Sequence, residues 1–181
     1  MKTDLLDIRH MDCMELMAEF PDNHFDLAVV DPPYRDQNQP TKGMRNSRSK
    51  ITSKRSVKTE ILGKKPMLSY FDELKRVSKN QIIWGANNFS DIGDYKGFIV
   101  WEKINIPEKF TMSMAEIASV SEGLSTISKI YRETSNRGGN SIHPTQKPIK
   151  LYDFILANYA EKGMKILDTH LGSMSSAIAC H

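Results

Sequence analysis

The stretch "AVVDPPYRDQ" (residues 28–37) decides what fold to expect. An apolar run from Leu27 to Val30 leads directly into Asp31, two prolines and Tyr34. A near-continuous apolar run is typical of a central strand in a parallel sheet, because both faces of such a strand are buried. Open α/β sheets bind their ligands beyond the carboxyl ends of the strands. We therefore expect Asp31 to lie at the ligand-binding edge of an α/β sheet.

The residues after this strand suit a planar group that carries an amino substituent. The carboxylate of Asp31 only accepts hydrogen bonds, and Pro32 and Pro33 offer carbonyl oxygens without competing amide hydrogens. Tyr34 adds a flat ring for stacking. If Asp31 and the Pro32 carbonyl accepted both hydrogens of a nucleobase amine, its lone pair would localise and could attack an electrophilic methyl group. The alternative is an ordinary Asp-Pro turn at the end of a strand.

Length and composition indicate one soluble globular domain over residues 1–181. The chain is 39% hydrophobic and 26% charged, which is ordinary for that class. No apolar run is long enough to span a bilayer, and the N-terminus lacks the apolar stretch of a signal peptide. Cys13 and Cys180 form no metal-like pair, so we expect free thiols, a cytoplasmic location and no metal site.

The positive charge of the chain is concentrated in residues 35–65. This segment holds ten of the 25 Lys and Arg residues but two of the 22 Asp and Glu residues. It is polar and without periodicity, which predicts a basic mobile loop inserted in the domain. Such a loop favours a polyanionic partner, most simply nucleic acid, although a solvated insertion that touches nothing is the alternative. The residues expected to contact phosphates are Arg35, Arg45, Arg48, Lys50, Lys54 and Arg55.

The hydrophobic pattern alternates between strands and helices, which predicts an α/β fold with a mainly parallel twisted sheet. Strands are expected over 4–11, 25–30, 81–84, 96–103, 114–121 and 164–170, and helices over 13–20, 66–79 and 149–163. Residues 171–181 are expected to begin as a tight turn and to continue as a helix. Residues 132–148 read as a loop, and Gly163 is expected to close the helix before it. A doubly wound sheet would continue beyond the last helix, so we expect a truncated C-terminus at His181.

Several motifs resemble those of amino-methylating DNA methyltransferases, which transfer a methyl group from S-adenosylmethionine. "DPPY" (31–34) looks like their catalytic motif, and "IHPTQKP" (142–148) resembles the segment before the cofactor loop in the permuted β-class. "ILDTHLGSMSSAIA" (166–179) is similar to their methionine-binding loop, and "HMDCMELM" (10–17) to a segment that opens many members. The resemblance covers nearly the whole chain except the basic loop. It implies a Rossmann-like S-adenosylmethionine-dependent methyltransferase fold with helices on both faces and a circularly permuted motif order.

The resemblance also implies the site residues. The catalytic set is Asp31, Pro32, Pro33 and Tyr34. The cofactor-binding set is Asp12, Cys13, Asp31, Thr145, Gln146, Lys147, Asp168, His170, Gly172, Ser173 and Ser175. Without the resemblance, Asp12 would be read as a helix N-cap and residues 143–148 as a loop that starts a helix.

Within the cofactor loop, Asp168 is expected to take the ammonium group of S-adenosylmethionine, and Gly172 to let the backbone approach it closely. Ser173 and Ser175 would cap the following helix and bind the carboxylate, as an anion suits a helix N-terminus. Met174 stands where a second glycine is common in the family. An ordinary serine-capped helix is the alternative.

The implied function is site-specific methylation of the N6 amine of adenine in a flipped-out DNA base. The Asp form of the motif leans toward adenine and the Ser form toward cytosine N4. The alternatives are an N4-cytosine enzyme and a catalytically impaired nucleic-acid-binding module. DNA is the expected partner, no membrane is involved, and a homodimer is left open. Trp84 and Trp101 are expected in the core, and Glu116 has no assigned role.

Overall fold

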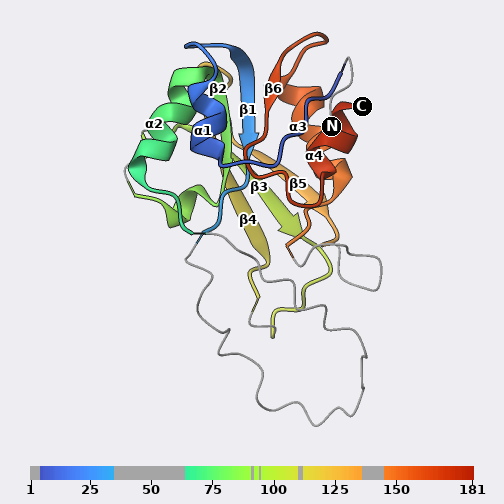
Figure 1. The fold of residues 1–181 in the computed structure, drawn as a ribbon. Coiled ribbons are helices and arrows are strands. Elements are labelled where there is room, and N and C mark those ends of the chain that lie inside the picture. The colour runs from blue at the N-terminus through green and yellow to red at the C-terminus, as the bar shows by residue number, and fades with distance from the viewer. Residues whose placement is uncertain (1–4, 35–63, 91, 94, 110–111, 136–144) are drawn as a thin grey trace, which may run out of the picture.

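The computed structural model of the chain describes residues 5–34, 64–90, 92–93, 95–109, 112–135 and 145–181 (Figure 1). Its centre is a six-stranded sheet with the strand order β5-β3-β4-β2-β1-β6. The strands are β1 (Phe25–Val30), β2 (Ser78–Trp84), β3 (Gly97–Lys103), β4 (Ala115–Val120), β5 (Lys129–Glu133) and β6 (Ile166–Leu167).

One strand of this sheet, β4, runs against the others. β1 pairs in parallel with β2 and β6, and β3 pairs in parallel with β5, whereas β4 is antiparallel to both β2 and β3. The expected mainly parallel sheet is therefore confirmed. As a consequence, the start of β4 lies at the same edge of the sheet as the ends of β1, β2 and β3.

Helices cover both faces of the sheet, as expected (Figure 1). The helices are α1 (Cys13–Ala18), α2 (Leu68–Val77), α3 (Ile149–Tyr159) and α4 (Ser175–Cys180), and a short 3-10 turn, η1, spans Ala86–Asn88. α1 and α2 lie on one face, and α3 and α4 on the other.

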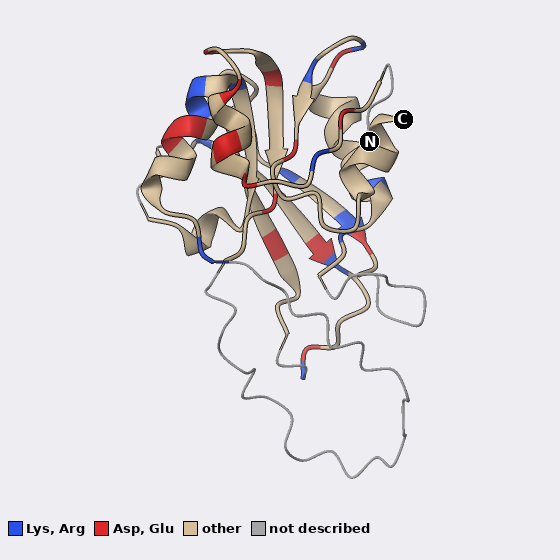
Figure 2. Ribbon diagram, viewed as in Figure 1, with Lys and Arg blue, Asp and Glu red and all other residues tan. Residues whose placement is uncertain are grey.

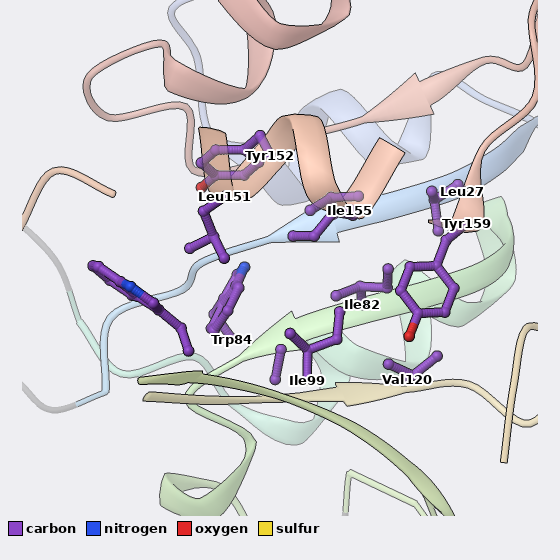
Figure 3. Packing of buried hydrophobic residues seen from close by; sticks show 12 residues of the cluster. Leu27, Ile82, Trp84, Ile99, Val120, Leu151, Tyr152, Ile155 and Tyr159 are labelled. Carbon is purple, nitrogen blue, oxygen red and sulfur yellow. The ribbon is translucent and has the colours of Figure 1, made fainter. Parts of the chain in front are cut away.

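Strand β1 is buried on both faces, which is why its sequence is almost continuously apolar. Leu27 and Val29 pack with α3 in one apolar cluster, and Ala28 and Val30 pack with α1 and α2 in the other. Figure 3 shows the first cluster, in which Trp84 lies beneath α3. Each large buried aliphatic side chain contributes about 1.5–3 kcal/mol through removal from water. The strand that carries Asp31 is thus held by two cores.

Trp84 and Trp101 are both core residues, as predicted, with 0% and 2% of their surfaces exposed. Among the described residues, no helix is long and apolar enough to cross a membrane. Helix α2 carries both acidic and basic residues, and its Glu73 and Arg76 form an ion pair (Figure 2).

Several expectations about the elements were wrong. The helix expected over 66–79 ends at Val77, because Ser78 and Lys79 already belong to β2. The strand expected over 4–11 is reduced, in its described part, to an isolated bridge at Asp7. β5 falls partly within the expected loop, because "KIYRE" is polar and its alternating half-burial is that of an edge strand. α3 ends at Tyr159, so that Gly163, with φ of 94°, belongs to the turn that follows.

Candidate active site

Charged side chains from four separate segments meet at the carboxyl edge of the sheet. Asp31 directly follows β1, and Lys103 is the last residue of β3. Glu116 is the second residue of β4 and pairs in register with Trp101 of β3. The antiparallel direction of β4 brings Glu116 to this edge, and Lys147 enters from the segment before α3. We call these four residues the ionic cluster.

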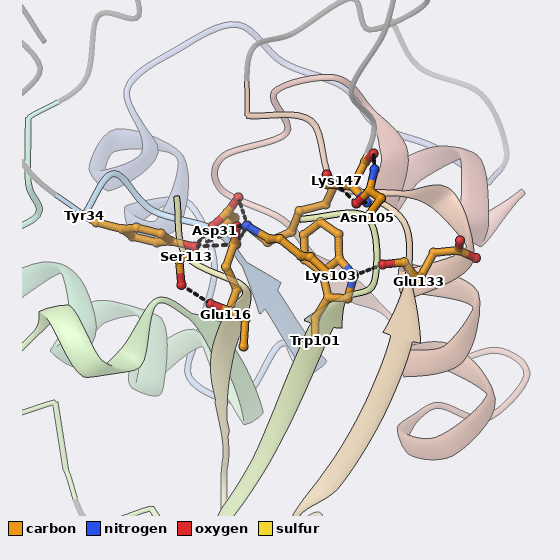
Figure 4. Close-up of polar contacts among 11 residues, drawn as sticks. Asp31, Tyr34, Trp101, Lys103, Asn105, Ser113, Glu116, Glu133 and Lys147 are labelled. Atoms are coloured by element: carbon orange, nitrogen blue, oxygen red, sulfur yellow. Dashed lines mark hydrogen bonds and ion pairs between the residues drawn. The ribbon is translucent and has the colours of Figure 1, made fainter. Parts of the chain in front are cut away.

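The charges of the ionic cluster alternate in sign (Figure 4). Lys147 Nζ lies 2.5 Å from Asp31 Oδ2 and 3.1 Å from Glu116 Oε2. Glu116 also forms an ion pair with Lys103 through its other oxygen. The order Asp31, Lys147, Glu116, Lys103 therefore places each cation beside a carboxylate and leaves the cluster without net formal charge.

Burial makes these contacts strong. The side chain of Lys147 is 4% exposed, and that of Asp31 is 21% exposed. Burial lowers the pKa of Lys147, but the charges of Asp31 and Glu116 raise it by more, so its pKa lies above the ordinary value. Burial raises the pKa of Glu116, and the two lysines lower it by more, so the net pKa shift is downward. Both groups are thus charged at neutral pH.

The hydroxyl of Tyr34 joins this cluster from the side. Tyr34 Oη donates a hydrogen bond to Asp31 Oδ1 at 2.7 Å and accepts one from Lys147 Nζ at 3.2 Å. Burial, followed by the negative charges of Asp31 and Glu116, raises the pKa of Tyr34. The phenol therefore stays protonated and fixes the orientation of the Asp31 carboxylate.

The ring of Tyr34 lies directly against Gly85, the residue that follows β2. Gly85 has φ of 69°, and a Cβ atom built on it would stand 2.1 Å from Tyr34 Cε1. The ring of Phe89 meets that of Tyr34 edge-on, at 6.3 Å between centroids. Glycine at position 85 thus serves both the left-handed turn and the close approach of the Tyr34 ring.

Asp168 lies at the end of β6, in the expected cofactor loop. Its Oδ1 accepts a hydrogen bond from the His170 amide at 2.9 Å, and its Oδ2 accepts one from Ser176 Oγ at 2.5 Å. Burial raises the pKa of Asp168 to about 6, although both hydrogen bonds oppose the rise. Burial also lowers the pKa of His170 to about 4. The loop therefore holds a neutral imidazole next to a carboxylate that is costly to ionise.

The turn after His170 contains two left-handed residues, Gly172 with φ of 51° and Met174 with φ of 63°. Met174 occupies the N-cap position of α4 and makes no side-chain cap hydrogen bond. The expectation that Ser173 and Ser175 cap this helix was wrong, because Met174 holds the N-cap position and the Ser175 hydroxyl donates instead to the Lys147 carbonyl at 2.8 Å. Ser173 Oγ lies 3.0 Å from Ser175 Oγ. This pair ties the cofactor loop to the segment that carries Lys147.

The remaining predicted residues divide into three groups. Asp12 is the N-cap of α1, where its side chain accepts from the amides of Met14 and Glu15, and Cys13 is a half-buried free thiol. Thr145 is exposed and Gln146 is half-buried, and both lead into Lys147. The residues predicted to bind DNA lie outside the described residues; they are Arg35, Arg45, Arg48, Lys50, Lys54 and Arg55.

Sequence reasoning missed three residues of this site, Gly85, Lys103 and Glu116. A glycine directly after a buried strand signalled the turn at Gly85, but nothing local signalled its contact with Tyr34. Glu116 and Lys103 read as ordinary charged residues in strands, since only the direction of β4 brings them together. Lys147 was expected to line the cofactor pocket, and its ammonium forms an ion pair with Asp31 that the sequence did not signal.

The sequence profile described as "DNA methylase" matches residues 62–181. YubD of Escherichia coli (strain K12), which carries a provisional name as a methylase, is 24% identical over 182 residues, covering 93% of this chain and 76% of YubD.

Two solved structures share the fold. The M1.HpyAVI–SAM complex has a TM-score of 0.57 at 19% identity, covering 95% of this chain and 86% of that one. The cytosine-N4-specific PvuII DNA methyltransferase has a TM-score of 0.58 at 13% identity, covering 93% and 75%. The α/β arrangement of this chain is thus the Rossmann-like fold of DNA methyltransferases.

Proposed function

Because this chain belongs to the DNA methylase family, we propose that it transfers a methyl group from S-adenosylmethionine to the N6 amine of adenine in DNA. Its motif order is that of the permuted β-class, with "DPPY" ahead of the cofactor loop. The observation that carries the proposal is the carboxylate of Asp31, which a tyrosine hydroxyl orients at the carboxyl edge of the sheet. Such a carboxylate can accept hydrogens of an exocyclic amine.

The chemistry follows from what the site offers. Asp31 and the Pro32 carbonyl accept the two amino hydrogens, which localises the lone pair of that nitrogen. Pro33 fixes the turn, and the ring of Tyr34, held against Gly85, offers a stacking surface for the base. S-adenosylmethionine supplies the methyl group when bound. After transfer, the nitrogen loses one proton to Asp31, and the phenol hydrogen bond keeps the carboxylate in place.

The cofactor loop has a donor set that fits S-adenosylmethionine. A buried carboxylate with a raised pKa favours a bound cation, and the ammonium group of the cofactor would serve as that cation for Asp168. Gly172 is exposed and left-handed, so the backbone there can come close to a ligand. Ser173 would bind the carboxylate of the methionine portion. The rest of the proposed set is Asp12, Cys13, Asp31, Thr145, Gln146, Lys147, His170 and Ser175.

DNA is the proposed partner because the basic segment starts directly after Tyr34 in the sequence, and its last residue, Lys65, lies near Phe89, which contacts the Tyr34 ring. The segment begins at the residue after Tyr34 and ends at Lys65. Lys65 Nζ donates to the Asn88 carbonyl at 2.8 Å and lies 5.6 Å from the centre of the Phe89 ring, which itself contacts Tyr34. Arginines and lysines between these ends would neutralise phosphates around an extruded base.

Methylation of cytosine N4 is the second candidate, favoured by the shared fold with the cytosine-N4-specific PvuII enzyme. An assay with labelled cofactor and DNA of mixed sequence, followed by digestion to nucleosides, separates the two. We expect label in N6-methyldeoxyadenosine. Label in N4-methyldeoxycytidine would show that the target is cytosine N4 and not adenine N6. DNA binding without any label would indicate a catalytically impaired nucleic-acid-binding module.

A further inference from the structure

Glu116 is the least expected member of the ionic cluster, because it comes from the one strand that runs against the sheet. The titratable and charged groups that face it come from every neighbouring element. They are Lys103 from β3, Lys147 from the segment before α3, Asp31 and Tyr34 from the segment after β1, and Tyr152 of α3.

Lys147 is shared between two carboxylates. Its ammonium contacts Asp31 at 2.5 Å and Glu116 at 3.1 Å, and its side chain is 4% exposed. A buried charge that loses its partner destabilises a protein strongly. Glu116 thus provides the partner that Lys147 would keep if Asp31 became neutral.

Methyl transfer to an amine makes Asp31 neutral at one step. The bond from sulfur to the methyl carbon breaks and the nitrogen–carbon bond forms, so that the sulfonium becomes a thioether and the nitrogen becomes positive. An N–H bond then breaks, its electrons stay on nitrogen, and Asp31 takes the proton. Asp31 no longer balances the ammonium of Lys147 at that point, whereas Glu116 still does.

We propose that Glu116 is a positioning residue for methyl transfer, which keeps Lys147 paired while Asp31 gains and releases the proton. This inference rests on the proposed function. Lys103 has the opposite effect, because its own ion pair with Glu116 weakens the attraction between Glu116 and Lys147. Removing Glu116 should therefore leave Lys147 paired more strongly with Asp31, and removing Lys103 should leave it paired less strongly with Asp31.

The test compares Glu116→Gln and Lys103→Met in steady-state methyl transfer at a series of pH values. In Glu116→Gln we expect kcat to fall at least tenfold, with an unchanged KM for S-adenosylmethionine, and the acid limb of kcat to move to lower pH. In Lys103→Met the acid limb should move to higher pH. Glu116→Asp, which keeps the charge, should recover part of kcat. Glu122→Gln, which removes a carboxylate from an exposed pair with Lys96, is the matched control.

The outcomes separate the two proposals. Both variants break the Lys103–Glu116 pair, so a structural role alone would move the two acid limbs in the same direction or leave both in place. If the unaltered chain is active and the two acid limbs move in the same direction or do not move, the proposed role of Glu116 is wrong. The proposed function would still hold. An unaltered chain that binds DNA and cofactor but transfers no methyl group overturns the proposed function and this inference together.

Discussion

Lys147 Nζ lies 2.5 Å from Asp31 Oδ2, although the two residues are 116 positions apart in the sequence. This contact joins the segment before the cofactor loop to the segment after β1. It also places a buried cation between the carboxylates of Asp31 and Glu116. The proposed base-binding and cofactor-binding halves of the site therefore depend on one side chain.

Replacing Lys147 with methionine should destabilise the protein and abolish methyl transfer. The partly buried carboxylates of Asp31 and Glu116 would then lose the cation between them. We expect the free energy of unfolding to fall by about 3–5 kcal/mol in chemical denaturation. Lys96→Met is the control, because the Lys96–Glu122 pair is 61% exposed on both sides and should contribute less than about 1 kcal/mol. If the free energy of unfolding fell equally in Lys147→Met and Lys96→Met, the buried ion pairs of Lys147 would not be the source of the stability.

Replacing Gly85 with alanine should move the ring of Tyr34 and reduce methyl transfer on the order of 100-fold, since small displacements of catalytic groups are costly. Gly163→Ala is the matched control. Gly163 also has a left-handed φ, of 94°, but a Cβ atom there meets nothing within 4 Å. Both variants should lose about 1–2 kcal/mol of stability in thermal unfolding. If methyl transfer survives in Gly85→Ala as it does in Gly163→Ala, the Tyr34 ring is not positioned by Gly85.

The sequence was sufficient to predict most strands and the place of Asp31, because a buried strand leaves a strong apolar pattern. It was insufficient for the ionic cluster. Glu116 reaches Lys147 only because β4 is antiparallel, and strand direction leaves no mark on hydrophobic periodicity. The strand over residues 129–133 was missed because an edge strand carries charged side chains. Asp12 was correctly recognised as an N-cap candidate, since capping depends on neighbouring residues alone.

Binding of S-adenosylmethionine should weaken below about pH 6. The pKa of Asp168 is raised to about 6 by burial, so Asp168 is ionised above this pH and protonated below it. An ammonium group binds the ionised form, and affinity should therefore fall roughly tenfold between pH 7 and pH 5. Calorimetric titration across this range measures the effect. Asp168→Asn should bind S-adenosylmethionine weakly at every pH. If this variant still showed the same pH dependence of binding, Asp168 would not be the group responsible for it.

Replacing Met174 with glycine should stabilise the protein. Met174 has φ of 63°, a left-handed conformation that costs a side chain roughly 1–2 kcal/mol but is open to glycine. After the entropic cost of glycine, we expect a gain of about 0.5–1 kcal/mol in the free energy of unfolding. Asn23→Gly is the comparison, because asparagine at φ of 56° already tolerates this region. A gain at position 23 as large as that at 174 would argue against strain at Met174.

The variant Asp31→Asn tests whether the carboxylate of Asp31 takes part in methyl transfer. The amide keeps the shape of the side chain but cannot accept the proton. The measurement is the rate of label transfer from S-adenosylmethionine to DNA, at cofactor concentrations shown by titration to saturate both proteins. We predict that the unaltered chain labels deoxyadenosine and that Asp31→Asn loses at least 1,000-fold in rate, about 4 kcal/mol of transition-state stabilisation, while still binding the cofactor. Equal rates in the two proteins would contradict the account.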